Sequence, residues 1–212
     1  MAGYLNENRE FFHVFPNLLS ELSVPHPKTG KAISLIEHQI AKLRIQREKL
    51  QIEVDTLKDI AGENGELLHK VYLLTNALLA AKTDQEAIDA IYRILKEEFL
   101  VEHLALVSWD VPLGNVSGIA QLGFSQDWSI ALKTRLDSTE PVCGLLDDEW
   151  QRGLFQTNQN IESACILPLG NKRTWGVLAM GATSSRFSDE LGTYFLKMIA
   201  RMITERLKRL FE

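Results

Sequence analysis

A long heptad repeat in the first half of the chain is the feature that most constrains its fold. From Ile36 onward, apolar residues recur at alternating steps of four and three, and ten of the thirteen positions in this series are apolar. A helix with such a seam buries it against a partner helix. The residues expected to form the dimer seam are Ile36, Ile40, Leu43, Leu50, Val54 and Leu57.

The repeat is long enough to favour association with a second chain. If residues 34–81 form one helix, it extends about 70 Å at 1.5 Å per residue, more than a domain of this size can cover with its own core. We therefore favour a coiled-coil homodimer. The alternative is an antiparallel hairpin that breaks at Gly62 and Gly65, because each glycine costs about 1 kcal/mol inside a helix.

The rest of the chain predicts an α+β domain. Residues 1–33 are expected to be a short helical segment and a linker, with residues 24–30 in the linker, and residues 82–212 a separate domain. In that domain the pattern predicts a helix after Thr83, strands near 104–111, 116–122, 163–169 and 174–182, and a C-terminal helix from Ser188. This order is typical of an antiparallel sheet flanked by helices, and the nearly continuous apolar composition of the last two strands indicates that both faces are covered.

Composition and motifs argue against several classes of function. The net charge of −5 lacks the basic excess that nucleic-acid binding needs, and no apolar run approaches the roughly 20 residues of a membrane span. The first ten residues lack the apolar core of a secretory signal, so the cytoplasm is the expected location. Nucleotide-binding, metal and catalytic motifs are not found, so no cofactor is identified and no enzymatic activity is expected.

One face of the predicted sheet is expected to hold a small-molecule cavity. Residues 123–160 combine short helices with polar loops, and such a cover tends to leave a gap above a sheet. Each candidate also fits ordinary core packing, which is the commoner role of an aromatic side chain. The candidate pocket residues are Trp109, Phe124, Trp128, Cys143, Phe155 and Trp175.

The end of the chain resembles a GAF domain, a sensory module of the PAS-like group. The run SACILPL, then WGVLAMG, then RF and a long helix carry this resemblance. Over nearly its full length, the chain resembles an uncharacterised proteobacterial family with an N-terminal coiled coil and a C-terminal GAF-like domain. The segments FFHVFPNLLSEL, PHPKTGKAISLIEHQIAKLR, AGENGELLHKVYLL, CGLL and RFSDELGTYFL carry that match. The resemblance implies a six-stranded type of sheet, helix-mediated dimers and a cavity of unknown occupant.

Three functional hypotheses follow. The first is a homodimeric sensor or regulatory module, whose signal passes to a downstream protein partner because no output domain is recognised. The second is a ligand-free scaffold for protein interactions, whose cavity is filled by side chains. The third is a thiol-based redox enzyme, which requires Cys143, expected in a loop, to lie close to Cys165, expected inside a strand.

Overall fold

The chain divides into two compact units, residues 1–63 and 64–212. The computed structural model describes residues 4, 7–8, 10–25, 32–123, 127–136, 140–157, 159–171, 173–188 and 192–211. The longest helix, α4 (Leu35–Ala80), contributes residues to both units.

Short elements precede α4 in the first unit. Helices α2 (Phe11–Val14) and α3 (Pro16–Glu21) follow one another, and Pro16 stands at the start of α3, where its missing N–H is not needed. Strands β1 (Ser23–Pro25) and β2 (Ala32–Ser34) form an antiparallel pair. The expectation of a plain linker from residue 24 is therefore corrected, because Val24 and Pro25 pair with Ile33 and Ala32.

Helix α4 is continuous and begins directly after Ser34. It contains Gly62 and Gly65, so the chain does not turn back into a hairpin there. Added Cβ atoms at these glycines would meet nothing within 4 Å. The two glycines thus leave the helix intact and leave open space beside it.

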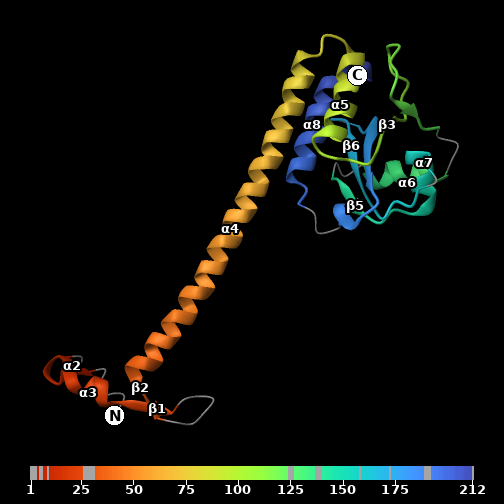
Figure 1. Ribbon diagram of the computed structural model, residues 1–212. Helices are drawn as coiled ribbons and strands as arrows, with labels where there is room; N and C mark the ends of the chain where they lie inside the picture. The colour runs from red at the N-terminus through yellow and green to blue at the C-terminus, as the bar shows by residue number, and fades with distance from the viewer. Residues whose placement is uncertain are drawn as a thin grey trace. The chain divides into compact units, whose positions relative to one another are not determined.

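The second unit is built on a five-stranded sheet (Figure 1). Its strands lie in the order β4 (Ala120–Gln121), β3 (His103–Ser108), β7 (Gly176–Ala182), β6 (Ser163–Leu169) and β5 (Val142–Gly144). The β3–β7, β7–β6 and β6–β5 pairs are antiparallel. Among the residues described, the sheet has five strands rather than the six that the GAF resemblance implies.

Helices cover both faces of the sheet, as the sequence predicts. Every residue of β6 and β7 is buried, and alternate residues point to opposite faces. Cys165, Leu167 and Leu169 join a core with α5 (Asp84–Glu97), α8 (Tyr194–Leu207) and the end of α4. Ala164 and Ile166 join a second core with α6 (Asp127–Arg135) and α7 (Asp148–Phe155), on the other side of the sheet (Figure 1).

Two sequence-based expectations for this unit are corrected. The segment 116–122 does not form a hairpin with β3; it contributes the two-residue strand β4, which pairs with β3 in parallel. The segment between β3 and β4 is bound to α5 instead. The Ser117 N–H donates a hydrogen bond to the side-chain oxygen of Gln85, and the Ser117 carbonyl accepts one from the side-chain nitrogen of Gln85. The last helix, α8, begins at Tyr194 rather than Ser188, since Ser188 follows the 3₁₀ helix η2 (Ser185–Phe187) in an extended conformation.

Candidate functional site

Aromatic side chains pack tightly on the face of the sheet that α6 and α7 cover. Trp109 is 5% exposed, and its indole nitrogen donates a hydrogen bond to the Ser129 hydroxyl of α6 at 2.9 Å. The Lys133 ammonium lies 5.4 Å from the centre of the Trp109 ring. This indole therefore has a partner inside the protein instead of presenting its N–H to a cavity.

Trp128 and Phe155 occupy the space beside α7 and β7. An added Cβ at Gly153 would lie 2.2 Å from the Trp128 ring, so the indole rests directly on the α7 backbone. Phe155 packs against Gly181 of β7 in the same way. A Cβ added at Gly181 would lie 3.2 Å from the Phe155 ring. The absence of a side chain at these two glycines makes room for the aromatic rings.

Trp150 was not singled out from the sequence, although it belongs to the same core. It lies in α7 and is 8% exposed, and the Arg135 guanidinium lies 5.7 Å from its ring centre. Its four-residue spacing from the buried Leu154 is the signal that could have identified it.

Trp175 and Cys143 lie in the core on the other face of the sheet. Trp175 is fully buried and stacks on Phe211 with ring centres 4.0 Å apart. Its indole nitrogen has no hydrogen-bond partner among the described residues. The structure thus brings Trp109, Trp128 and Phe155 to one core and Trp175 and Cys143 to the other, while Phe124 lies outside the described residues. Ligand binding by these residues remains a prediction.

Open hollows of the second unit lie away from most of these side chains. A depression of about 320 Å³ at the edge of β3 and β4 is bordered by Tyr92, Leu106 and Phe155. The Tyr92 hydroxyl donates to the Gly118 carbonyl at 2.8 Å and accepts from the Leu106 N–H at 3.1 Å. Burial raises the pKa of Tyr92, so the phenol remains a neutral structural link.

A groove of about 310 Å³ runs between α4 and α8. Its lining is mostly apolar and includes Leu78, Leu79, Met202 and Arg206. Leu79 is 80% exposed. Leu78 and Leu79 are consecutive apolar residues at the end of α4. An apolar residue directly after a seam position is the sequence feature that could have indicated this groove.

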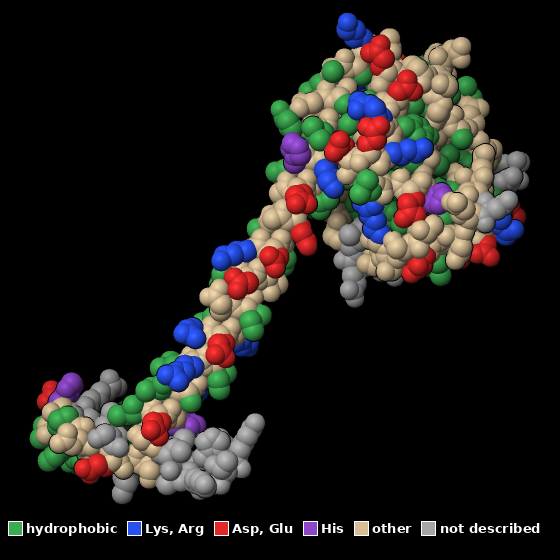
Figure 2. Space-filling model, viewed as in Figure 1, with side chains coloured by type: hydrophobic (Ala, Val, Ile, Leu, Met, Phe, Trp, Pro, Cys, Tyr) green, Lys and Arg blue, Asp and Glu red, His purple; other side chains and the backbone are tan. Residues whose placement is uncertain are grey.

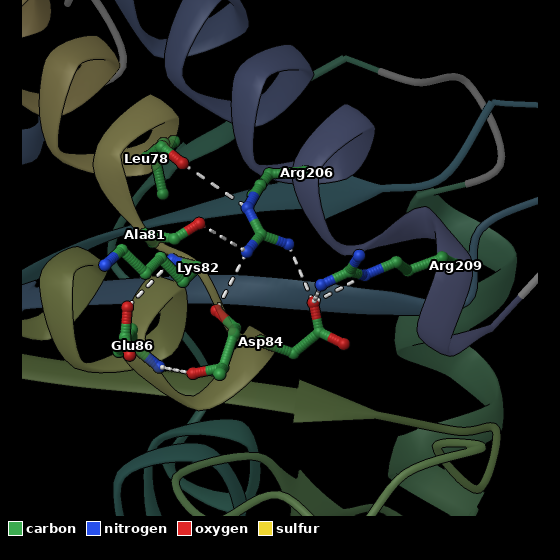
Figure 3. A network of polar contacts seen from close by, with 8 residues as sticks. Leu78, Ala81, Lys82, Asp84, Glu86, Arg206 and Arg209 are labelled. Carbon is green, nitrogen blue, oxygen red and sulfur yellow. Dashed lines mark hydrogen bonds and ion pairs between the residues drawn. The ribbon is translucent and has the colours of Figure 1, made fainter.

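A network of polar contacts joins α4, α5 and α8 next to this groove (Figure 3). Arg206 of α8 donates to the carbonyls of Leu78, Ala81 and Thr83 and binds the Asp84 carboxylate at 2.7 Å. The Leu78 carbonyl is among the last four of α4, which a helix leaves without a partner of its own. Arg209 binds the same carboxylate.

The charge of Asp84 depends on these two arginines. Burial raises the pKa of Asp84, but hydrogen bonds and charges from Arg209 and Arg206 outweigh burial and hold the pKa below its usual value. At the start of α5, Thr83 caps the helix by accepting a hydrogen bond from the Glu86 N–H at 3.1 Å. Arg206 therefore binds the turn between α4 and α5 to α8.

The seam of α4 is exposed in its first part and buried in its last. Leu50 is 60% exposed and Leu57 is 64% exposed, and Figure 2 shows hydrophobic side chains at the helix surface among charged ones. Ile36 is half-buried, while Ile40, Leu43 and Val54 are exposed. The later positions Val71 and Leu78 are buried in the core of their own unit, so they are not available to a partner helix.

The two cysteines lie directly opposite one another on neighbouring strands. Cys143 belongs to the short strand β5 rather than to the expected loop, and it pairs in register with Cys165 of β6. The sulfur atoms are 2.8 Å apart, with Cys165 buried and Cys143 partly accessible. The hydrogen bond with Cys143, together with burial, raises the pKa of Cys165.

The residues that the structure describes hold neither a candidate metal site nor a candidate membrane span. Within the described part of the chain, no group of three or more His, Cys, Asp or Glu side chains is placed to hold a metal ion. The helices of that part include none that is both long and apolar enough to cross a membrane.

The full sequence is similar to a family defined by sequence. Residues 1–212 match the model of a family described as "Protein of unknown function, DUF484". One relative, "Uncharacterized protein YigA" from Salmonella typhimurium (strain LT2), is 24% identical over 212 residues, which cover 99% of this chain and 90% of that protein.

Two solved structures resemble this chain in fold over about two thirds of its length. The GAF domain of an Acinetobacter phosphoenolpyruvate-protein phosphotransferase has a TM-score of 0.50 and 12% identity, covering 66% of this chain and 92% of that one. The GAF domain of a Coxiella burnetii phosphoenolpyruvate-protein phosphotransferase has a TM-score of 0.50 and 15% identity, covering 68% and 93%. The GAF-like fold expected from the sequence is confirmed.

Proposed function

The chain belongs to this family of proteins of unknown function, and from that starting point we propose that it is a homodimeric, non-catalytic regulatory module of GAF-like fold that acts through helix contacts. The exposed seam of α4 carries the proposal. Fully burying a leucine, isoleucine or valine side chain stabilises a protein by about 1.5–3 kcal/mol. Five seam residues, from Ile40 to Leu57, are 43–64% exposed, so each would gain roughly half of that stabilisation against a second copy.

Charges beside the seam favour a parallel dimer in register. With Leu50 and Leu57 at d positions, Glu53 stands at a g position and Lys58 at the following e position. In a parallel coiled coil these positions of opposite chains are neighbours, so two Glu53–Lys58 pairs form across the interface. Arg47 stands at an a position, where a polar residue lowers stability but restricts register and oligomeric state.

A second exposed stripe lies on the part of α4 that belongs to the unit 64–212. Leu68, Tyr72 and Leu79 are exposed, and with Thr75 they keep the four-three spacing of the seam. The stripe runs along the side of α4 that Val71 and Leu74 leave uncovered, because those residues point into the core. This stripe offers a second copy an apolar surface within the unit 64–212.

The packing of the aromatic residues supports a protein-interaction scaffold over a sensor with an enclosed ligand. The Trp109 indole N–H donates a hydrogen bond to the Ser129 hydroxyl, and the Trp128 ring packs on the backbone of Gly153. Ligand pockets usually measure about 300–1,000 Å³ and enclose most of their ligand. The depression at Tyr92 and the groove between α4 and α8 both reach the lower end of this range, but both are open hollows. A downstream protein partner and a cytoplasmic location remain predictions that accompany this proposal.

The oligomeric state tests the proposal. We expect light scattering of the full-length protein to give twice the chain mass of 24.0 kDa. Leu50→Asp combined with Leu57→Asp should give monomers at the same concentration, because buried unpaired carboxylates strongly oppose association.

A matched control uses exposed apolar residues on the same helix. Ile45 and Ile52 are each 67% exposed but stand at f positions, opposite the seam. The Ile45→Asp, Ile52→Asp variant should remain dimeric. A dimer that survives Asp at 50 and 57, or that is lost equally in the control, would contradict the assignment of the seam.

A separate measurement addresses the choice between scaffold and sensor. Native mass spectrometry of the protein purified from its host should give the dimer mass without a bound small molecule. A stoichiometric adduct that is lost on denaturation would favour the sensor instead and would leave the dimer assignment intact.

A further inference from the structure

We propose that Cys143 and Cys165 form a peroxide-sensitive dithiol, which closes to a disulfide across β5 and β6. The proposal does not depend on dimerisation. It rests on the register of the two strands, the separation of the sulfur atoms and the different accessibility of the two thiols.

The strand register places the cysteines in bonding geometry. Directly opposed residues of an antiparallel pair have Cα atoms about 4.5–5.5 Å apart, within the range of about 4.4–6.8 Å found for disulfides. The sulfur atoms are already 2.8 Å apart. Reaching a bond length of about 2.05 Å requires side-chain adjustment and leaves the strand pairing in place.

The surroundings assign a different role to each thiol. Cys165 is fully buried in the middle of β6, whereas Cys143 lies on the edge strand and is partly accessible. An oxidant in solution therefore reaches Cys143 first. The raised pKa of Cys165 agrees with this order, because Cys165 keeps its proton until its partner has reacted.

The oxidation proceeds in two balanced steps. The Cys143 thiolate attacks one oxygen of hydrogen peroxide; an S–O bond forms, the O–O bond breaks, and the departing hydroxide takes a proton to become water. The Cys165 sulfur then attacks the sulfenic sulfur of Cys143, forming the S–S bond and breaking the S–O bond. The hydroxide released takes the Cys165 proton. Two thiols and one peroxide thus give one disulfide and two waters.

The disulfide would restrain a short edge of the sheet. Strand β5 comprises only Val142–Gly144, and among the described residues it has a neighbouring strand on one side. Glu140, just before β5, pairs with Lys197 of α8 at 2.5 Å. Oxidation therefore adds a covalent restraint to β5, near the residue that contacts α8, and reduction removes this restraint.

Peptide mapping of the full-length protein tests the proposal. Trypsin cleaves after Arg135, Arg152 and Lys172, which separates Cys143 in peptide 136–152 from Cys165 in peptide 153–172. After native treatment with hydrogen peroxide and alkylation of the remaining thiols, we expect these peptides to be linked and the protein to have lost two hydrogen atoms. The crosslink spans a sequence separation of 22 and should raise the melting temperature by about 5–10 °C.

Single substitutions separate the two roles. Cys165→Ala should leave Cys143 as a sulfenic acid that dimedone traps, and Cys143→Ser should slow oxidation of Cys165 at least tenfold. Circular dichroism of both variants checks that they fold. Wild-type protein that forms no linked peptide, forms it only in urea, or links cysteines between chains would overturn the proposal.

Discussion

Replacing Arg206 by alanine tests whether one side chain holds α4, α5 and α8 together. The Arg206 side chain is 17% exposed and that of Asp84 is 19% exposed, so their interaction is only partly screened by solvent. The change removes the ion pair and the hydrogen bonds to three carbonyls. Hydrogen bonds to charged groups contribute about 1.5–3 kcal/mol each, and they do not add fully. We expect the free energy of unfolding to fall by about 3 kcal/mol.

The matched control is Arg209→Ala, because Arg209 contacts the same carboxylate from the same end of the molecule. Its side chain is 59% exposed, and exposed ion pairs contribute about 0–1 kcal/mol. Arg206→Lys should recover only part of the loss, since one ammonium cannot reach the partners of a planar guanidinium.

Urea unfolding followed by tryptophan fluorescence measures these changes in the relevant unit. All four tryptophans lie between residues 109 and 175, within the unit 64–212. If Arg206→Ala costs no more than Arg209→Ala, the network does not hold the helices together and the reasoning fails.

The same variants give a test by pH. The pKa of Asp84 is lowered in the folded protein, by hydrogen bonds that outweigh burial. A carboxylate with a depressed pKa contributes stability that is complete above its unfolded pKa and is lost as the pH falls through the folded value. Wild-type protein should therefore lose more stability than Arg206→Ala between pH 7 and about pH 3. Equal losses would contradict the role given to Asp84.

Three further predictions concern packing and association. Gly153→Ala should lower the free energy of unfolding by about 1–3 kcal/mol in urea titrations, because its Cβ would overlap the Trp128 ring; an unchanged midpoint would show that the ring can move away. Gly62→Ala meets no neighbouring atom and should stabilise α4 by about 1 kcal/mol, seen as slower amide exchange along the helix, whereas faster exchange would contradict a continuous helix. Arg47→Leu should tighten the dimer about tenfold in analytical ultracentrifugation by replacing a charge at the seam, and a weaker dimer would exclude Arg47 from the interface.

The general plan of the fold could be predicted from the sequence because periodicity is a local property. The four-three spacing from Ile36 indicated the helix that became α4, and the apolar runs indicated β6 and β7. The pairing of the strand expected at 116–122 could not be predicted in the same way. A strand after Asn115 was expected to pair antiparallel with β3, but hydrogen bonds between Ser117 and Gln85, far apart in the sequence, direct this segment differently.

The candidate site was less predictable because its residues meet only through the sheet. Trp109 and Trp175 both flank strands and are both large and apolar, and nothing in the sequence near either one states which face it joins. Strand register and the hydrogen bond to Ser129 place Trp109 beside α6, whereas stacking on Phe211 places Trp175 beside α8. These contacts join residues that are distant in the chain.

The sequence by itself determined the helical seam of α4, since the direction of each side chain on a helix follows from its position in the repeat. Tertiary structure decided how that seam is used, because Val71 and Leu78 carry the same pattern as Leu50 and Leu57 but are buried by α5 and α8. It also decided the meeting of the two cysteines. Neither composition nor spacing specifies a strand register, whereas the β5–β6 pairing brings their sulfur atoms within 2.8 Å. Local periodicity sets the direction of a side chain, and packing between distant segments sets what it contacts.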